Sequence, residues 1–415
     1  MNDRYPGMRV RFLRQEERLI QSDEHEMPLV FEAQEHRDVP WLQNFLTHHS
    51  KQIIQDLAQY GALLFRGFAV KNEADFEHSL LSIPEFRGIH EAFMSENGRD
   101  QVPGNQYVLY TNSVYKTGGT LYLGGFHTEN YYSADVPSYI SFCCLEPSAL
   151  GGETGIINTA KIYAELNPAL QQRLQQESFF VSEWRVDEVA KRYGHEPKHI
   201  ETICEHFDLP LLGKERNRLV RMYKPSVMHH PLTQENALTI NLFELTTLND
   251  ALRKIFMHDY QGADWFWHRF LWRMPPQVFN ALEQGAKWGI PLYHSPVKAW
   301  HMALNKWSEK RASKKNGLNT TPKVGTCFNE EEVQELARSM RRHYCSCLWQ
   351  KGDILLVDNR KVMHAGMPGK GARAIRAMIG NPLEMRYSAQ NPGYISGNER
   401  KTASIGACMA AGQVH

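Results

Sequence analysis

The segments that decide the fold are Leu121-Tyr-Leu-Gly-Gly-Phe-His-Thr-Glu129 and Ser138-Tyr-Ile-Ser-Phe-Cys-Cys-Leu145. Both are short, rich in residues that favour strands, and bounded by Gly or Pro. Gly151-Gly152 predicts the turn that follows, and residues 154–158 predict another short strand. Short strands separated by tight turns are typical of a β-rich fold.

Strands of the same kind occur far away in the sequence. Gly61-Ala-Leu-Leu-Phe-Arg-Gly-Phe68 is an apolar run between glycines, which predicts a buried strand near the beginning of the core. Gly352 opens a strand at residues 354–357, and residues 374–379 are predicted as the final strand. These non-local returns predict a mainly β fold with flanking helices, built on a double-stranded β-helix (jelly-roll) core.

Helical patterns flank this predicted core. Residues 40–60 carry apolar side chains at helical spacing, while Asn72 and Asn329 are placed to cap two further helices. The aromatic run at residues 265–272 predicts a mostly helical, buried insert that could serve as a lid or a partner surface. We therefore predict one domain over residues 1–415, with a jelly-roll core and helical flank at 40–245 and 325–382, a helical or loop insert at 246–324, and a C-terminal tail at 383–415.

Composition excludes several classes of protein. The 415 residues include 47 basic and 46 acidic side chains, so the formal net charge is +1 and offers no general attraction for nucleic acid or an anionic membrane. We expect neither as a partner. No apolar run approaches the roughly 20 residues that span a bilayer. Seven cysteines without a framework spacing, and an N-terminus without an apolar signal region, predict a cytoplasmic protein with reduced thiols. Oligomeric state has no signal in the sequence.

His127 and Glu129 are candidate metal ligands. Side chains at positions i and i+2 of a strand project from one face, about 6.5–7 Å apart, so an imidazole and a carboxylate there can converge on one ion. His364, which follows the strand at 354–357, could supply a third ligand. Two histidines and one carboxylate form the facial triad of non-haem iron(II) oxygenases. This triad leaves three positions open, two for a chelating 2-oxo acid and one for dioxygen.

Two further residues have the chemistry to bind such an acid. Thr154 follows the glycine turn after His127, and Arg373 lies shortly after His364. A hydroxyl group can donate to a carboxylate, and a guanidinium can bind one through two parallel hydrogen bonds. One His-x-Glu tripeptide is weak evidence in a chain with 19 histidines, but chance does not readily account for all these elements in this order.

The same motifs resemble the taurine dioxygenase and clavaminate synthase superfamily, most closely its syringomycin-type biosynthetic branch. The resemblance rests on Phe126-His-Thr-Glu129, Gly151-Gly-Glu-Thr154 and the segment from Trp349 through Gly352-Asp-Ile-Leu-Leu-Val-Asp-Asn359 to His364 and Arg373. It implies a distorted jelly roll and an iron(II) dioxygenase that uses 2-oxoglutarate and O2. His127, Glu129 and His364 fall on the metal positions of the family, and Thr154 and Arg373 fall on its cosubstrate positions.

Several alternatives stay open in the sequence. The loop after His364 is short, so Arg376 is a rival to Arg373 for the cosubstrate carboxylate. Asn359 could orient a metal ligand or face the substrate, or it could cap the turn in which it lies. A zinc hydrolase would use the same two histidines and carboxylate. A jelly roll that binds without turnover is the remaining alternative.

The substrate is predicted only by class. The branch resemblance implies a small molecule, namely an amino acid or an amino-acid-derived intermediate of natural-product biosynthesis. Such a substrate could be free or tethered to a carrier protein. The basic stretch Lys310-Arg-Ala-Ser-Lys-Lys315 could then help to dock an acidic carrier. Oxidation of an unactivated C–H bond would give hydroxylation, desaturation or cyclisation, with succinate and CO2 as coproducts.

Overall fold

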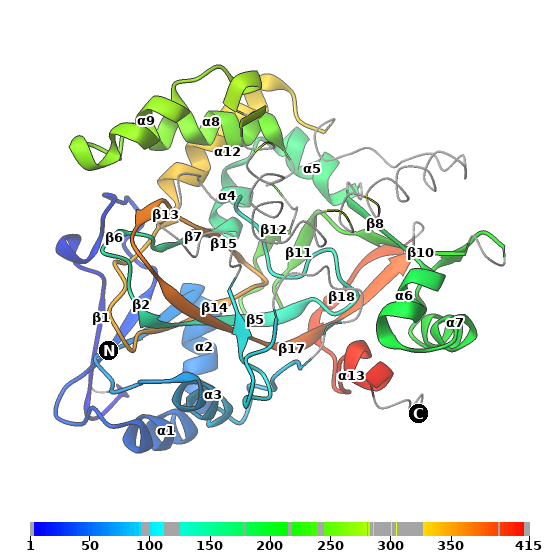
Figure 1. Cartoon of the computed structure of the whole chain (residues 1–415), viewed down its shortest axis with the longest axis horizontal. Helices are drawn as coiled ribbons and strands as arrows, with labels where there is room; N and C mark the ends of the chain where they lie inside the picture. Colours follow the sequence, from blue (N-terminus) through cyan, green and yellow to red (C-terminus); the bar gives the residue numbers. More distant parts are fainter. Residues whose placement is uncertain are drawn as a thin grey trace.

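The computed structural model describes residues 4–90, 92, 100–111, 125–176, 180–214, 218–239, 242, 245–279, 281, 282, 285, 300, 304, 327–388 and 391–410. Two β-sheets lie at its centre, between two layers of helices (Figure 1). The larger sheet runs in the order β1 (Met8–Phe12), β2 (Leu29–Ala33), β3 (Ala62–Arg66), β14 (Ile354–Asp358), β5 (Pro137–Glu146), β17 (Ala374–Ser388) and β18 (Asn391–Glu399), with β4 (Leu109–Tyr110) paired to β17. The smaller sheet consists of β13 (Tyr344–Cys345), β7 (Thr154–Asn158) and β15 (Val362–Gly366).

The two sheets pack face to face. Ile140 and Phe142 of β5, Val357 of β14, Ile156 of β7 and Val362 of β15 all belong to one buried apolar cluster. Residues that alternate with them belong to the outer faces, as expected for the period of two along a strand. This arrangement, with long-range antiparallel pairing between β14 and both β3 and β5, confirms the predicted mainly β fold with a jelly-roll core.

Helices cover the outer face of each sheet. On the larger sheet lie α1 (Val39–His48), α2 (Ser50–Tyr60) and α3 (Glu73–Leu81), and on the smaller sheet lie α4 (Thr159–Glu165), α5 (Pro168–Gln176), α8 (Thr246–Phe256) and α12 (Glu330–Arg342). The helical caps follow the sequence closely. Asn72 accepts from the Asp75 amide at the beginning of α3, and Asn329 forms a capping box with Glu332 at the beginning of α12.

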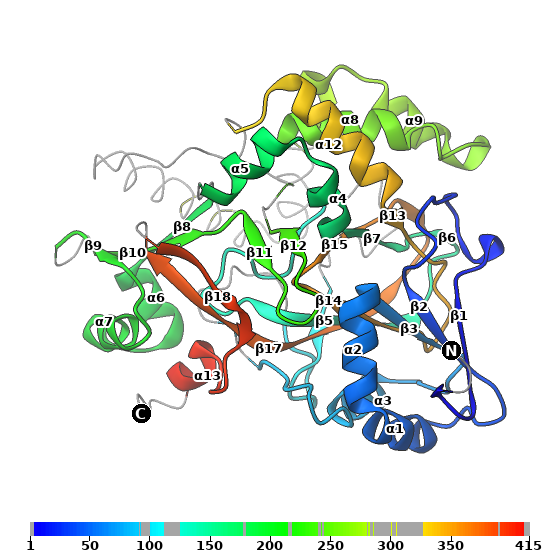
Figure 2. The ribbon, with the colours of Figure 1, turned by 180° about the vertical axis from the view of Figure 1, so that it is seen from behind.

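A smaller unit extends the molecule to one side, where α6 and α7 lie close to β10 and α13 (Figure 2). It contains α6 (Val186–Tyr193), α7 (Pro197–His206), α13 (Ile405–Ala410) and the sheet β8 (Phe180–Arg185), β10 (Leu219–Lys224) and β9 (Leu211–Leu212). Two short antiparallel pairs complete the described strands, namely the hairpin of β11 (Val227–His229) and β12 (Asn236–Leu238) and the long-range pair of β16 (Gly369–Lys370) and β6 (Leu150–Gly151).

The chain ends depart from the predicted boundaries. Residues 374–379 are not the final strand, because β17 continues to Ser388 and then pairs with β18. The expected beginning of the tail at residue 383 therefore lies inside β17. At the other end, β1 and β2 join the larger sheet ahead of residue 40. None of the helices in the described ranges is long and apolar enough to cross a membrane.

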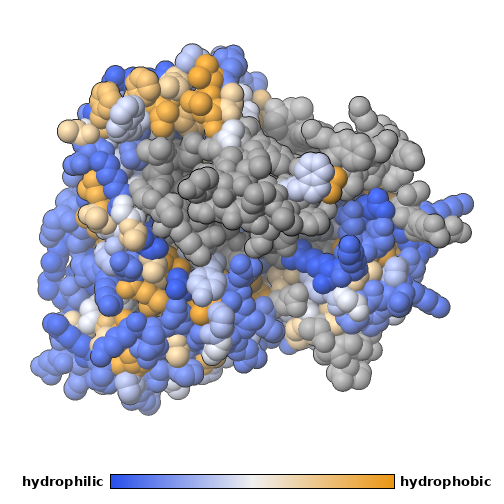
Figure 3. Space-filling model, viewed as in Figure 1, coloured by the Kyte–Doolittle hydropathy of each residue, from blue (hydrophilic) through white to orange (hydrophobic). Residues whose placement is uncertain are grey.

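The described part of the insert is helical and only partly buried. After α8 it forms the short helices η6 (Ala263–Trp265) and α9 (Phe266–Trp272). Trp265 and Trp272 are buried, but Trp267 is 64% exposed, so the prediction of a helical, buried insert is right for the helices and only in part for the burial. Figure 3 shows apolar surface over the part of the molecule where α8 and α9 lie in Figure 1. Most of the remaining insert, including the basic stretch, lies outside the described residues.

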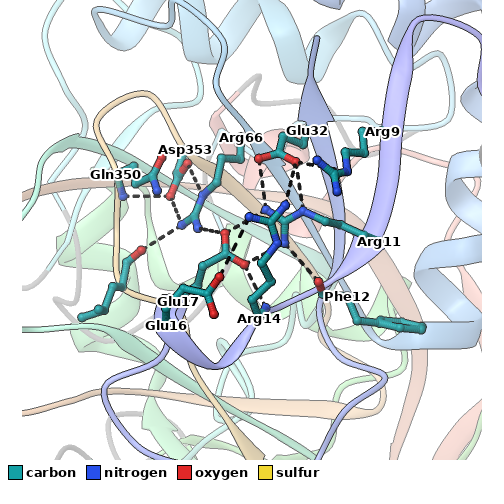
Figure 4. Close-up of polar contacts among 11 residues, drawn as sticks. Arg9, Arg11, Phe12, Arg14, Glu16, Glu17, Glu32, Arg66, Gln350 and Asp353 are labelled. Carbon is teal, nitrogen blue, oxygen red and sulfur yellow. Dashed lines mark hydrogen bonds and ion pairs between the residues drawn. The ribbon is translucent and has the colours of Figure 1, made fainter.

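A buried ion-pair network fastens the N-terminal strands to the core (Figure 4). Arg66 of β3 contacts Asp353 through Nη2 and Oδ2 at 2.6 Å and Glu17 through Nη1 and Oε1 at 3.0 Å. Arg11 joins Glu17 at 2.6 Å and Glu32 of β2 at 2.9 Å. The charges of Arg66 and Asp353 are almost completely removed from water, so each depends on its partner.

The Glu17 carboxylate should make stability depend on pH below about 4.5. Burial alone would raise its pKa, but hydrogen bonds and charge from Arg11, the Arg14 amide and Arg66 lower the pKa from 4.5 to about 2. A lowered pKa stabilises the folded chain above pH 4.5, and this contribution, at most about 3 kcal/mol, is lost as pH falls toward 2.

Urea unfolding between pH 6 and pH 3 tests this prediction. Glu17→Gln should lower stability at pH 6 and flatten the fall toward pH 3. The matched control is Glu16→Gln, because the Glu16 side chain is 70% exposed and lies 4.0 Å from Arg14. Equal pH profiles for the two variants would contradict the prediction.

Candidate metal centre

Three predicted ligands meet at the inner face of the smaller sheet. One ligand atom from each of His127, Glu129 and His364 lies within 4.8 Å of the others. Glu129 Oε2 is 3.3 Å from His364 Nε2, and the centroids of the two imidazole rings are 4.6 Å apart. Among the described residues, no other group of three His, Cys, Asp or Glu side chains is arranged in this way.

Strand alternation directs His364 to this position. Its neighbours Met363 and Ala365 belong to the outer cluster beneath the helices, whereas Val362 belongs to the cluster between the sheets. His364 therefore faces inward, where its ring packs edge-on against Phe142 at 5.1 Å. Phe142 was not singled out from the sequence, although its place in the predicted strand at 138–145 puts it on the inner face.

The prediction that His127 and Glu129 lie on a strand was wrong, because within residues 125–129 only an isolated bridge pairs His127 with His364 of β15. The His127 amide donates to the His364 carbonyl at 3.1 Å, and the His364 amide donates back at 2.9 Å. The His127 Nδ1 lies 2.8 Å from the Gly125 carbonyl oxygen, so Nδ1 carries the proton and the ring's lone pair is on Nε2. Glu129 lies in the turn that follows, and its amide donates to Asn359 Oδ1 at 2.6 Å.

Thr154 and Arg373 converge at the end of β15. Thr154 of β7 is paired with Gly366, two residues beyond His364, and alternation places it on the same inner face as Ile156. An added Cβ at Gly366 would lie 3.9 Å from Arg373 Nη2, and Arg373 Nη1 donates to the Gly152 carbonyl. The hydroxyl and the guanidinium therefore lie beside the same glycine.

The Arg373 guanidinium is a half-buried cation with no acidic partner among the described residues. Burial lowers its pKa, but arginine remains charged in proteins. Within the described ranges, no carboxylate lies at ion-pair distance from it. Glu153 is close enough to influence it, yet burial raises the pKa of Glu153 to about 7, so below neutral pH this side chain is largely protonated. The charge of Arg373 therefore favours an anionic ligand at this point.

Arg376 is not brought to the site. On β17 it alternates with Ile375 and Ala377, which belong to the cluster between the sheets. Its side chain lies on the opposite face, where Nε contacts Glu73 Oε1 of α3 at 2.8 Å and the guanidinium lies 4.7 Å from the Tyr110 ring. The structure thus separates the two arginines that the sequence left as rivals.

The donor set fits iron(II) and a 2-oxo acid. Two imidazoles and one carboxylate on one side of an ion leave adjacent coordination positions open. The Arg373 guanidinium and the Thr154 hydroxyl lie beside Gly366, two residues beyond His364, and suit the far carboxylate of a short dicarboxylate. Together, the fold and this site define the class of mononuclear non-haem iron oxygenases.

The chain belongs to the taurine catabolism dioxygenase TauD, TfdA family, whose model matches residues 23–261. It is 21% identical over 351 residues to the dapdiamide synthesis protein DdaC of Enterobacter agglomerans, covering 82% of this chain and 88% of that protein. It is 23% identical over 338 residues to a clavaminate synthase-like protein of Arabidopsis thaliana, covering 78% and 82%.

One solved structure that is similar over most of both chains is that of PvcB, an Fe, alpha-ketoglutarate dependent oxygenase from an isonitrile synthetic pathway. PvcB has 13% identity, a TM-score of 0.46, and coverage of 92% of this chain and 93% of that chain. A taurine dioxygenase from Burkholderia xenovorans has 12% identity, a TM-score of 0.43 and coverage of 98% and 99%.

Family membership confirms the resemblance seen in the sequence. The chain is an iron(II)- and 2-oxoglutarate-dependent dioxygenase, with O2 as the oxidant. The finer likeness to the syringomycin-type branch stays a prediction, as do the roles of individual residues.

Proposed function

We propose that this dioxygenase oxidises an unactivated C–H bond of an amino acid or an amino-acid-derived intermediate in natural-product biosynthesis. In this proposal His127, Glu129 and His364 hold the iron, and Thr154 and Arg373 hold 2-oxoglutarate. The observation that carries it is the convergence of these three ligand side chains within 4.8 Å, in a chain of this family, with Arg373 beside the end of β15.

Each residue has a distinct task in this mechanism. When bound, iron supplies the activation of O2, which is coupled to decarboxylation of 2-oxoglutarate to succinate and CO2 and to oxidation of the substrate. Arg373 and Thr154 would hold the far carboxylate of the cosubstrate and so orient it relative to His127, Glu129 and His364. Phe142 and the inner apolar cluster exclude water from the side of His364.

Support for the substrate class comes from the relatives. DdaC is named for dapdiamide synthesis, and the relative from Arabidopsis thaliana is named for its likeness to clavaminate synthase. The proposal allows either a free substrate or a substrate that is tethered to a carrier protein. Tethering would give the basic stretch at 310–315 and the helical insert a role as a partner surface or lid. The seven free cysteines agree with a cytoplasmic location, which we include in the proposal.

An anaerobic titration of metal-free protein with iron(II) and 2-oxoglutarate tests the cofactor roles. We expect the weak visible absorption band of an iron(II)–2-oxo acid chelate, and succinate formation once O2 and a substrate amino acid are admitted. A folded protein that shows no band and binds zinc in preference would favour a hydrolase. A folded protein that binds no metal would favour a jelly roll without turnover.

A further inference from the structure

Asn359 connects the two segments that carry the candidate ligands. Its side-chain Oδ1 accepts from the Glu129 amide at 2.6 Å, and its Nδ2 donates to the Glu129 carbonyl at 3.2 Å. The same Nδ2 donates to the Pro137 carbonyl at 2.8 Å. One amide group thus holds both backbone polar groups of Glu129, and Asn359 itself is only 2% exposed.

Asn359 is itself held rigidly. It follows β14 directly, and its own amide donates to the Ser138 carbonyl of β5 at 2.8 Å. The preceding Asp358 is fully buried between Arg360, whose Nη2 lies 2.7 Å from it, and His230, whose Nε2 lies 3.0 Å from it. These contacts fix the position of the Asn359 backbone and therefore of the base of its side chain.

The turn between β14 and β15 does not depend on the Asn359 side chain. Asp358 caps this turn, since its Oδ1 accepts from the Arg360 amide at 3.1 Å and its carbonyl accepts from the Lys361 amide at 3.3 Å. Turn capping, one of the roles that the sequence left open for Asn359, is therefore performed by its neighbour.

We propose that Asn359 is a positioning residue that fixes the Glu129 backbone relative to the ends of β14 and β5, and so sets where the carboxylate of the metal centre lies. The inference rests on the proposed role of His127, Glu129 and His364 as ligands. A glutamate side chain has one more rotatable bond than aspartate, so its carboxylate stays in place only if the base of the side chain is fixed. The His127–His364 backbone pairing holds the histidines, and Asn359 provides the equivalent restraint for Glu129.

Asn381 offers a matched control. It is a second fully buried asparagine that joins backbone segments, and it lies outside the candidate metal centre. Its Oδ1 accepts from the Arg87 amide at 2.8 Å, and its Nδ2 donates to the Glu85 carbonyl at 2.7 Å. Because Asn381 has a φ of 59°, alanine there also strains the backbone, so Asn381→Ala should lose at least as much stability as Asn359→Ala.

The test measures cobalt(II) affinity of the metal-free full-length chain by calorimetry, together with thermal unfolding. Asn359→Ala should bind cobalt(II) about 10–100-fold more weakly, the usual effect of removing a residue that orients a ligand. Asn381→Ala should bind within about twofold of wild type despite an equal or larger drop in Tm. Wild-type affinity in Asn359→Ala, or equal losses of affinity in the two variants, would overturn the inference.

Asn359→Asp keeps the test usable if the alanine variant does not fold. Aspartate has nearly the same shape and retains an acceptor for the Glu129 amide, but at neutral pH it cannot donate to the Glu129 and Pro137 carbonyls. It should also weaken cobalt(II) binding. Failure of the proposed function looks different, because wild type itself would then bind cobalt(II) no better than His364→Ala.

Discussion

Replacement of His364 by alanine is expected to abolish both metal binding and turnover. The imidazole supplies one of three ligands, and its Nε2 lies 3.3 Å from Glu129 Oε2, so its loss leaves only two donors on one side of the ion. A bound metal contributes several kcal/mol to a reaction of this kind, and about 1.4 kcal/mol corresponds to a tenfold change in rate. Succinate formation should therefore fall by about 1,000-fold or more.

The control for this variant is His229→Ala. His229 is exposed in β11, where its ring contacts Gln234 and Asn236 rather than the candidate site. Iron content after anaerobic loading and succinate formation would be measured for both variants. His229→Ala should match wild type. An iron-loaded, active His364→Ala protein would remove His364 from the ligand set.

Arg373→Met should lose 2-oxoglutarate binding, whereas Arg376→Met should retain it. The first change removes a half-buried guanidinium that has no acidic partner among the described residues and would pair with the cosubstrate carboxylate. Truncating one partner of a buried charge pair costs about 2–5 kcal/mol. The Kd for 2-oxoglutarate should therefore rise about 30-fold or more. The second change breaks only a partly buried ion pair with Glu73 on the outer face, so its cost should appear in stability.

Titration of each variant with 2-oxoglutarate, in the presence of iron(II) and absence of O2, distinguishes the arginines. The two substitutions are chemically identical and lie three residues apart, which makes them a closely matched pair. Weakened binding in Arg376→Met with normal binding in Arg373→Met would reverse our assignment. Equally weak 2-oxoglutarate binding in both variants would indicate a general disturbance of this part of the sheet rather than the loss of one carboxylate-binding side chain.

Strands with strong local signals could be predicted from the sequence. The observed β7 spans the predicted residues 154–158, β14 extends the predicted 354–357 by one residue, and β5 extends the predicted 138–145 by one at each end. Each combines apolar residues with a Gly or Pro boundary. The helix caps at Asn72 and Asn329 were equally readable, because capping depends on residues within one turn.

Elements that depend on distant partners could not be predicted in this way. The strand β18 contains Pro and Gly, which are depleted in strands, so its strand propensity is weak. The strand β1 does alternate arginine with apolar residues, but five residues near the N-terminus give only a short signal. Pairing with β2 and β17 makes them strands. At the site, the types of the ligand residues could be read from the sequence. The sequence could not predict that Arg373 and Arg376 lie on different faces, or that the Asn359 side chain forms hydrogen bonds with the Glu129 backbone, because both depend on contacts between distant segments.

The central place of β14 has a consequence for how this chain folds during synthesis. β14 lies between β3 and β5, although both are synthesised long before it. Until β14 emerges from the ribosome, β3 and β5 each present a hydrogen-bonding edge that lacks its final neighbour, and such edges are prone to pair with other chains. We therefore expect slow refolding limited by long-range pairing, and better yields when synthesis is slowed or chaperones are abundant.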